Sequence, residues 1–128
     1  MIRKFVEDFD RAIAASPVVL SSAIEKYLSP YGDSVYIKGT IRFIDSSSLD
    51  IAAFALNSAG RLSVDKYRFH YMDKKRQMVF RYDNAPHHRE IESHPHHKHT
   101  PLRVAPADMP AIEEILEEIG AGIFASET

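Results

Sequence analysis

The chain has 128 residues, of which 45% are hydrophobic and 27% are charged. This length and composition predict one domain over residues 1–128 with a single hydrophobic core. The absence of cysteine excludes disulfides, thiolate metal sites and thiol catalysis. No apolar run reaches the ~18 residues of a membrane span, and the N-terminus lacks a secretory-type apolar stretch. We therefore expect a soluble cytoplasmic protein that makes no membrane contact.

The formal net charge of −2 conceals a strong asymmetry along the chain. Residues 61–103 carry ten basic and five acidic side chains together with all seven histidines, whereas residues 104–128 carry six acidic side chains and no basic one. This pattern indicates an anion-binding region beside an acidic segment that binds a partner or the basic region itself. The alternative interpretation is that basic strands and an acidic helix are ordinary solvated surfaces.

Two amphipathic helices are predicted at the start of the chain. Residues 2–14 place apolar side chains at helical spacing, with charged side chains on the other faces. Ser16 and Pro17 are typical of an N-cap and a first helical position, and they predict a second helix that ends before residues 29–32. The apolar side of this second helix would consist of Leu20, Ile24, Tyr27 and Leu28.

Four strands and one further helix are predicted in the rest of the chain. Alternating or short apolar runs mark strands at 35–43, 49–56, 62–72 and 77–83, with Gly39 as a bulge position. Residues 84–106 are expected to be an irregular His-rich loop, in which 102–104 could add a short strand. The last helix should begin near Asp108 and Pro110 and end at Gly120. The expected fold is α+β, with two N-terminal helices, a four-stranded antiparallel sheet with helices on one face, a His-rich loop and a C-terminal helix.

The charged turn at residues 73–76 sets an expected register for the last two of these strands. A hairpin centred there makes one face aromatic and buried and the other face charged, because side chains alternate along a strand. The expected pairs are Tyr67 with Tyr82, Phe69 with Phe80 and Tyr71 with Met78 on the buried face, and Lys66 with Asp83, Arg68 with Arg81 and His70 with Val79 on the charged face.

The charged face of this hairpin has two interpretations. Neighbouring arginines repel each other unless an anion lies between them, so Arg68 and Arg81 beside His70 predict a phosphate clamp next to a proton carrier. Lys66 would add to the phosphate-binding residues, and Asp83 would orient an imidazole. The alternative is an ordinary solvated face, on which an ion pair contributes at most about 1 kcal/mol.

Six of the seven histidines lie within the thirteen residues from His87 to His99. In a catalytic interpretation, two imidazoles act as general acid and base on a phosphodiester and no cofactor is required. In a metal interpretation, histidines and a carboxylate hold an adventitious or regulatory Zn or Ni ion. In a third interpretation, the histidines only make local hydrogen bonds in a polar loop. The candidate residues are His70, His87, His88, His97 and Asp83 for catalysis, Lys66, Arg68, Arg81 and Lys98 for substrate binding, and His94, His96 and His99 for a metal.

Two blocks of sequence carry a family resemblance. The first runs from Arg81 to His88 as Arg-Tyr-Asp-Asn-Ala-Pro-His-His, and the second runs from His94 to His99 as His-Pro-His-His-Lys-His. With the basic aromatic hairpin before them and the acidic helix after them, they resemble the TumE-type toxin family of prokaryotic toxin–antitoxin systems, from about residue 27 to residue 124. The resemblance implies growth inhibition, exerted through RNA, that a cognate DNA-binding antitoxin neutralises. It assigns no catalytic residues.

Three hypotheses about function remain open. The first is a metal-independent endoribonuclease, the toxin of such a pair, in which histidines transfer protons and arginines stabilise the phosphorane. The second is a non-enzymatic RNA-binding module, with Tyr36, Tyr67 or Tyr82 stacking on bases. The third is a metal-binding domain or a metal-dependent hydrolase. The expected partners are RNA and a helix-turn-helix antitoxin, and a homo-oligomer is an open alternative.

Overall fold

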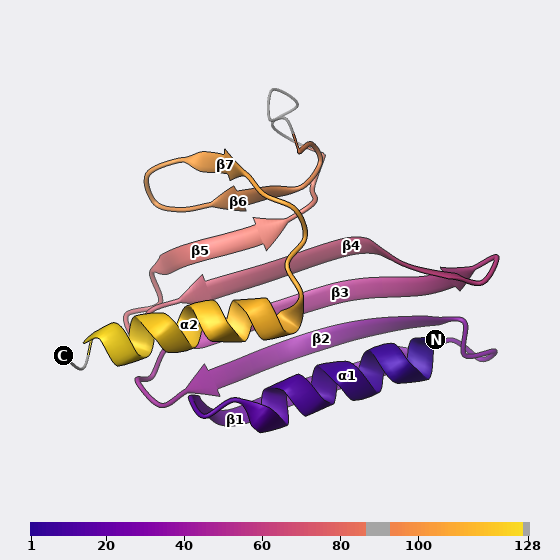
Figure 1. Cartoon of the computed structure of the whole chain (residues 1–128), viewed down its shortest axis with the longest axis horizontal. Helices are drawn as coiled ribbons and strands as arrows, with labels where there is room; N and C mark the ends of the chain where they lie inside the picture. The colour runs from indigo at the N-terminus through magenta and orange to yellow at the C-terminus, as the bar shows by residue number, and fades with distance from the viewer. Residues whose placement is uncertain (87–92, 127–128) are drawn as a thin grey trace.

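The computed structural model describes residues 1–86 and 93–126, and Figure 1 shows how their elements are arranged. Seven strands of this part form one antiparallel sheet in which each strand pairs with its neighbours in sequence. Both helices lie on the same face of the sheet, and neither is long and apolar enough to cross a membrane. The elements are α1 (Ile2–Ala15), β1 (Val19–Leu28), β2 (Ser34–Phe43), β3 (Ser48–Ser58), β4 (Arg61–Met72), β5 (Met78–Asp83), β6 (His97–His99), β7 (Val104–Pro106) and α2 (Ile112–Ser126).

The prediction of a second N-terminal helix is wrong, because residues 19–28 form the edge strand β1. This strand pairs with β2 along its length, from Val19 opposite Phe43 to Leu28 opposite Val35. Most of β1 is exposed, so it shows no clean alternation, and the nonlocal pairing with β2 overrides its helix-like apolar spacing. Pro17 follows the end of α1, a place where proline commonly stops a helix.

The prediction of a four-stranded sheet is also wrong, because β1, β6 and β7 extend the sheet at both edges. The strands β6 and β7 lie within the expected loop, and three residues are too few to show an alternating pattern. The last helix differs as well, since α2 starts at Ile112 and continues past Gly120 to Ser126. Ile119, Gly120 and Ile123 are all buried, so tertiary packing extends the helix beyond its glycines.

The β4–β5 hairpin has the predicted faces, but its register is shifted by two residues. The turn closes between Asp73 and Gln77 with Arg76 in the left-handed region (φ 62°), which adds one residue to the loop. An irregularity between Tyr71 and Met72 adds the second. Because the shift is an even number of residues from Arg68 to Tyr71, these side chains keep their expected faces, whereas the pair of Met72 and Met78, on the turn side of the irregularity, is shifted by one residue. The observed pairs are Arg68 with Asp83, Phe69 with Tyr82, His70 with Arg81, Tyr71 with Phe80 and Met72 with Met78.

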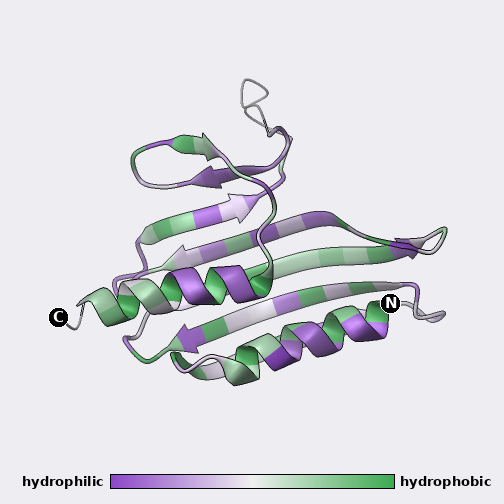
Figure 2. Ribbon diagram, viewed as in Figure 1, coloured by the Kyte–Doolittle hydropathy of each residue, from purple (hydrophilic) through white to green (hydrophobic). Residues whose placement is uncertain are grey.

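The two faces of the sheet differ in cover. On the helix face, alternate residues of β2 to β5 pack with α1 and α2 to form the core. Phe69 and Phe80 are 2% and 3% exposed there, which confirms their predicted burial. The opposite face, here called the open face, carries no helix in Figure 1, and Figure 2 shows hydrophilic residues at several positions of β4 and along β6.

Gly39 pairs regularly with Ile24 and is not the predicted bulge. A Cβ at Gly39 would lie 2.1 Å from the carbonyl oxygen of Ala23, far inside any contact distance. The backbone of β1 therefore lies so close to Gly39 that only glycine fits. Close approach of another backbone is, besides a bulge, a common reason for glycine inside a strand.

Candidate functional site

The open face arranges its polar side chains in rows across the sheet, since residues opposite each other on paired strands share a face. The Ala52 row consists of Lys38, Ala52, Arg68, Asp83 and His97, on β2 to β6. The neighbouring His70 row consists of Thr40, Asp50, His70, Arg81 and His99 on the same strands. The cations of β2, β4 and β5 on this face are Lys38, Arg42, Arg61, Lys66, Arg68 and Arg81, and the acids of β1, β3 and β5 there are Glu25, Asp50 and Asp83.

His70 lies between Asp50 on β3 and Arg81 on β5, with Arg68 two residues before it on β4. Burial, followed by the charges of Arg81 and Arg68, lowers the pKa of His70 below its ordinary value of 6.5, and Asp50 opposes this shift only in part. The ring is therefore neutral at pH 7. Its Nε2 is buried and has no hydrogen-bond partner among the described residues. A neutral imidazole beside two arginines can accept a proton from an anionic ligand that the arginines hold.

Asp83 is a buried carboxylate at the end of β5 that gathers several donors. Its Oδ2 accepts a hydrogen bond from Nε of Arg81 at 2.9 Å, and its Oδ1 accepts one from the backbone N–H of Ala85 at 3.0 Å. Nε2 of His97 lies 2.9 Å from Oδ1, and Nε2 of His99 lies 3.6 Å from Oδ2. Asp83 thus fixes the guanidinium of Arg81 on the open face and ties β5 to β6.

His97 is 2% exposed, and both of its ring nitrogens face oxygens that only accept. Nδ1 lies 2.8 Å from the carbonyl oxygen of Pro95, and Nε2 lies 2.9 Å from the carboxylate of Asp83. These two contacts hold the ring between the carbonyl oxygen of Pro95 and the carboxylate of Asp83. It positions Asp83, and through Asp83 it positions Arg81.

Asp83, His97 and His99 are the described residues that could hold a metal ion, because their ligand atoms lie within 4.8 Å of one another. Two imidazoles and a carboxylate suit Zn and other divalent transition ions, and a carbonyl at the second nitrogen often supports a ligating histidine. However, the guanidinium of Arg81 already occupies this carboxylate. A metal ion here would also have to replace the contact between Nε2 of His97 and Oδ1 of Asp83.

The described parts of the two sequence blocks meet where β5 pairs with β6, with Arg81 opposite His99 and Asp83 opposite His97. Asn84 continues the pairing of β5 with β4, since its Oδ1 accepts from the backbone N–H of Tyr67 and its Nδ2 donates to the carbonyl of Asp65, both at 3.0 Å. The hydroxyl of Tyr67 lies 2.9 Å from Nδ1 of His96, and the two rings are stacked at 5.8 Å. Burial, with Asp83 and Asp108 nearby, raises the pKa of Tyr67, so this hydroxyl stays protonated. The blocks therefore form the framework that holds Arg81 and Asp83.

Lys98, predicted to bind substrate, lies on the helix face and not with the arginines. Its Nζ lies 2.8 Å from the carboxylate of Glu118 on α2 and 4.9 Å from the ring centroid of Tyr82. The hydroxyl of Tyr82 donates to the same carboxylate at 2.8 Å. Burial alone would lower the pKa of Lys98, but Glu118 and Tyr82 hold it above its ordinary range. These contacts fasten α2 to β5 and β6.

The structure brings only some of the predicted site residues together. His94 is exposed, and among the described residues neither His94 nor His96 belongs to the group of possible metal ligands formed by Asp83, His97 and His99. His87 and His88 lie outside the described residues. The residues that do meet on the open face are Lys66, Arg68, His70, Arg81, Asp83, His97 and His99.

Sequence reasoning missed the aromatic part of the open face. Tyr27 and Phe54 are 53% and 37% exposed and form a row with Tyr36 across β1 to β3. The apolar spacing before residue 29 predicts a helix that includes Tyr27, and Phe54 belongs to a uniformly apolar run with no visible alternation. Of the three tyrosines expected to stack on bases, Tyr36 alone lies on this face. The one usable signal was the alternation of β2, which already pointed Tyr36 and Lys38 to the polar side.

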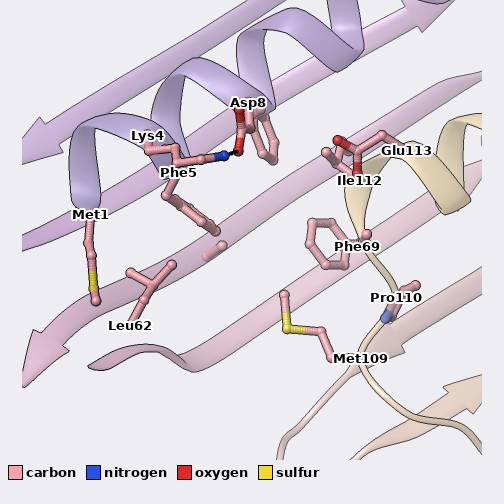
Figure 3. A pocket seen from close by; sticks show the side chains of 13 residues that line it. Met1, Lys4, Phe5, Asp8, Leu62, Phe69, Met109, Pro110, Ile112 and Glu113 are labelled. Atoms are coloured by element: carbon pink, nitrogen blue, oxygen red, sulfur yellow. Dashed lines mark hydrogen bonds and ion pairs between the residues drawn. The ribbon is translucent and has the colours of Figure 1, made fainter. Parts of the chain in front are cut away.

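The apolar groove on the helix face is a separate feature of about 460 Å³. Figure 3 shows it between the start of α1, the start of α2 and the strands beneath them. Its charged lining residues are Lys4, Asp8 and Glu113, of which the first two form an ion pair at 2.7 Å. It contains no histidine or arginine, so it offers an apolar surface and not acid–base chemistry. Its apolar lining includes Phe5, Phe9, Leu62, Phe69, Met109 and Ile112.

Comparison with known proteins agrees with the resemblance of the two sequence blocks. Residues 9–123 match the family described as Toxin TumE, so the match begins within α1, well before residue 27. No curated protein and no solved structure matches the chain. A toxin of this family implies a cognate antitoxin as its partner. The match covers most of the chain, and the protein belongs to the TumE toxin family, as the toxin component of a toxin–antitoxin system.

Proposed function

We propose that this toxin is a metal-independent endoribonuclease whose reaction takes place on the His70 row of the open face. The observation that carries the proposal is His70 itself, a neutral imidazole beside Arg68 and Arg81 whose buried Nε2 has no hydrogen-bond partner among the described residues. Most buried polar atoms in proteins have a hydrogen-bond partner. An exception calls for an explanation, and a catalytic role is one of the usual ones. Two arginines beside it supply the charge that a phosphodiester requires.

The proposed reaction uses the 2′-hydroxyl of RNA as its nucleophile. His70 takes the proton of this hydroxyl, the oxygen attacks the adjacent phosphorus, and the bond from phosphorus to the 5′-oxygen breaks. Arg68 and Arg81 stabilise the additional negative charge of the phosphorane. The products are a 2′,3′-cyclic phosphate and a 5′-hydroxyl, so no metal or water is consumed in this step.

His99 is the proposed acid that protonates the leaving 5′-oxygen. It lies on the far side of Arg81 from His70, two strands or about 10 Å along the row. This separation leaves room for a phosphate on Arg81 between the two rings. The carboxylate of Asp83, 3.6 Å from Nε2 of His99, is a favourable neighbour for a protonated ring.

The test is cleavage of a single-stranded RNA by the purified protein in the presence of EDTA. His70→Asn should lower the cleavage rate about 10²-fold or more, the usual scale for one acid–base group. Arg68→Ala and Arg81→Ala should also lower it and weaken RNA binding. His94→Asn and Arg3→Ala are matched controls, because both side chains are exposed and lie outside the open-face rows, and both should leave the rate unchanged. Cleavage at the full rate by His70→Asn would contradict the assignment.

The same experiment separates the two other functions. RNA binding without cleavage in any variant would favour the non-enzymatic RNA-binding module. Loss of cleavage in EDTA, restored by Zn or Ni, would favour a metal-dependent hydrolase with its ion at Asp83, His97 and His99. The second outcome has a specific observation in its favour, namely the 4.8 Å grouping of these ligand atoms.

A further inference from the structure

A hollow of about 480 Å³ lies on the open face, directly beside the His70 row. Its lining includes Tyr36, Ala52, Phe54, Lys66 and Arg68, from β2, β3 and β4. The hollow exists because the short side chain of Ala52 lies between longer ones on both neighbouring strands. Its volume lies within the range of small-ligand sites.

Aromatic rings and cations together surround this hollow. Tyr36 is 39% exposed and Phe54 is 37% exposed, and the ring centroid of Tyr27 lies 6.3 Å from that of Tyr36 at 32°. The described residues place no cover over these rings. Exposed rings on a sheet beside lysine and arginine match the surface on which unpaired bases stack while cations hold the phosphates.

We propose that the hollow binds one unpaired base of a single-stranded RNA, next to the phosphate that Arg68 and Arg81 hold. The proposal rests on the proposed function. The Ala52 row and the His70 row are two residues apart along each strand, about 6.5–7 Å, so a base in the hollow belongs to a nucleotide adjacent to the reacting phosphate. A duplex presents no unstacked base, so the hollow selects single strands.

The charges of the face also set the path of the RNA backbone. Lys66 and Arg68 lie at the β4 side of the hollow. In the Ala52 row, the residues on β2, β3 and β4 are Lys38, Ala52 and Arg68, and the first acid is Asp83 on β5. Glu25, at the β1 side, lies opposite Lys38 and bonds with the hydroxyl of Tyr27. The phosphates therefore follow β4, and the base points across β3 toward Tyr36.

The first test fills the hollow and measures binding of a short fluorescent 2′-O-methyl RNA, which cannot be cleaved through its 2′-oxygen. Ala52→Leu should weaken binding of the single strand about tenfold or more, the scale of one lost stacking contact. Ala23→Leu is the matched control, because Ala23 is exposed on the open face of β1 outside the hollow, and it should bind normally. Equal affinity of Ala52→Leu and the wild type would overturn the proposal.

The second test removes the stacking rings. Phe54→Ala and Tyr36→Ala should each weaken single-strand binding about five- to hundredfold without changing its salt dependence, because stacking releases no counterions. Tyr31→Ala, at a tyrosine that is 93% exposed away from the hollow, should have no effect. Equal affinity of the wild type for a duplex of the same sequence would contradict a base-binding hollow. If the base-binding proposal is wrong, His70-dependent cleavage is still observed. If the proposed reaction is wrong, the protein still binds the 2′-O-methyl RNA through the hollow.

Discussion

The two faces of the sheet are built from the same strands but differ in burial and in the chemistry of their side chains. On β4, Phe69 is buried beneath the helices, whereas Arg68 and His70, its neighbours in sequence, lie on the open face. The helix face is filled and fastened, with Lys98 and Tyr82 both bonded to α2. The open face instead keeps features that cost stability: partly exposed aromatic rings, clustered cations and, at His70, a ring nitrogen with no partner in the described part of the chain. Features of this kind persist where function requires them, so we infer that the helix face supplies stability and the open face supplies activity.

The largest expected effect is a difference in stability between two matched Phe→Ala substitutions, one on each face of the sheet. Phe69→Ala removes a ring that is 2% exposed and should lower the free energy of unfolding by about 3–5 kcal/mol. Phe54→Ala, on the open face of the adjacent strand, should lower it by less than about 1 kcal/mol, since its ring is already partly in water. Urea unfolding measures both. Similar decreases in the free energy of unfolding for the two variants would mean that both faces contribute equally to stability.

Asp83 is the place where the comparison should fail, because it belongs to the open face but is buried. Asp83→Asn leaves His97 and Arg81 without their carboxylate, and it should cost about 3 kcal/mol in the free energy of unfolding as well as RNA cleavage. Asp65→Asn, at an exposed residue of β4, is the control and should change neither. Urea unfolding and the cleavage assay are read on the same samples. A stable but inactive Asp83→Asn protein would show that Asp83 serves the reaction alone.

The faces could be predicted from the sequence because they depend only on parity. The strands at 35–43, 49–56, 62–72 and 77–83 lie close to their expected bounds, and Phe69 and Arg68 have their expected surroundings. The register could not be predicted, since a left-handed Arg76 and an irregularity beside Met72 leave no mark in the apolar pattern. The strand β1 could not be predicted for a related reason. It is an edge strand whose residues are mostly exposed, so its sequence does not alternate between apolar and polar residues.

The candidate site was predictable in composition but not in assembly. Arg68, Arg81, His70 and Asp83 were named from the hairpin, and they do share the open face. The contact of Asp83 with His97 depends on β6, a three-residue strand that no periodicity could reveal. The face of Lys98 could not be predicted for the same reason, since it follows from the pairing of β6 with β5 and its partner Glu118 lies on a distant helix.

A smaller effect distinguishes the lysines of the two faces. Lys98→Met removes a partly exposed ion pair with Glu118 and should lower the free energy of unfolding by at most about 1 kcal/mol, with RNA binding unchanged. Lys66→Met should leave stability unchanged, weaken RNA binding and reduce its salt dependence by about one ion. Thermal unfolding and binding titrations at several salt concentrations measure these outcomes. Weaker RNA binding by Lys98→Met would return Lys98 to the substrate-binding residues.

The smallest effect is a pH dependence of stability that originates on the open face. Burial, Arg81 on β5 and Arg68 on β4 lower the pKa of His70, and Asp50 on β3 raises it in part. The unfolded chain, in which His70 titrates near 6.5, then binds more protons than the folded protein does just below that pH. The free energy of unfolding should therefore be highest above pH 6.5 with respect to this group, and it should fall as the pH decreases from 6.5 toward the lowered pKa. His70→Asn should flatten this part of the profile, and Asp50→Asn should steepen it, because Asp50 favours the charged ring. Urea unfolding between pH 5 and pH 7.5 tests both, and an unchanged slope in His70→Asn would mean that other groups dominate that window.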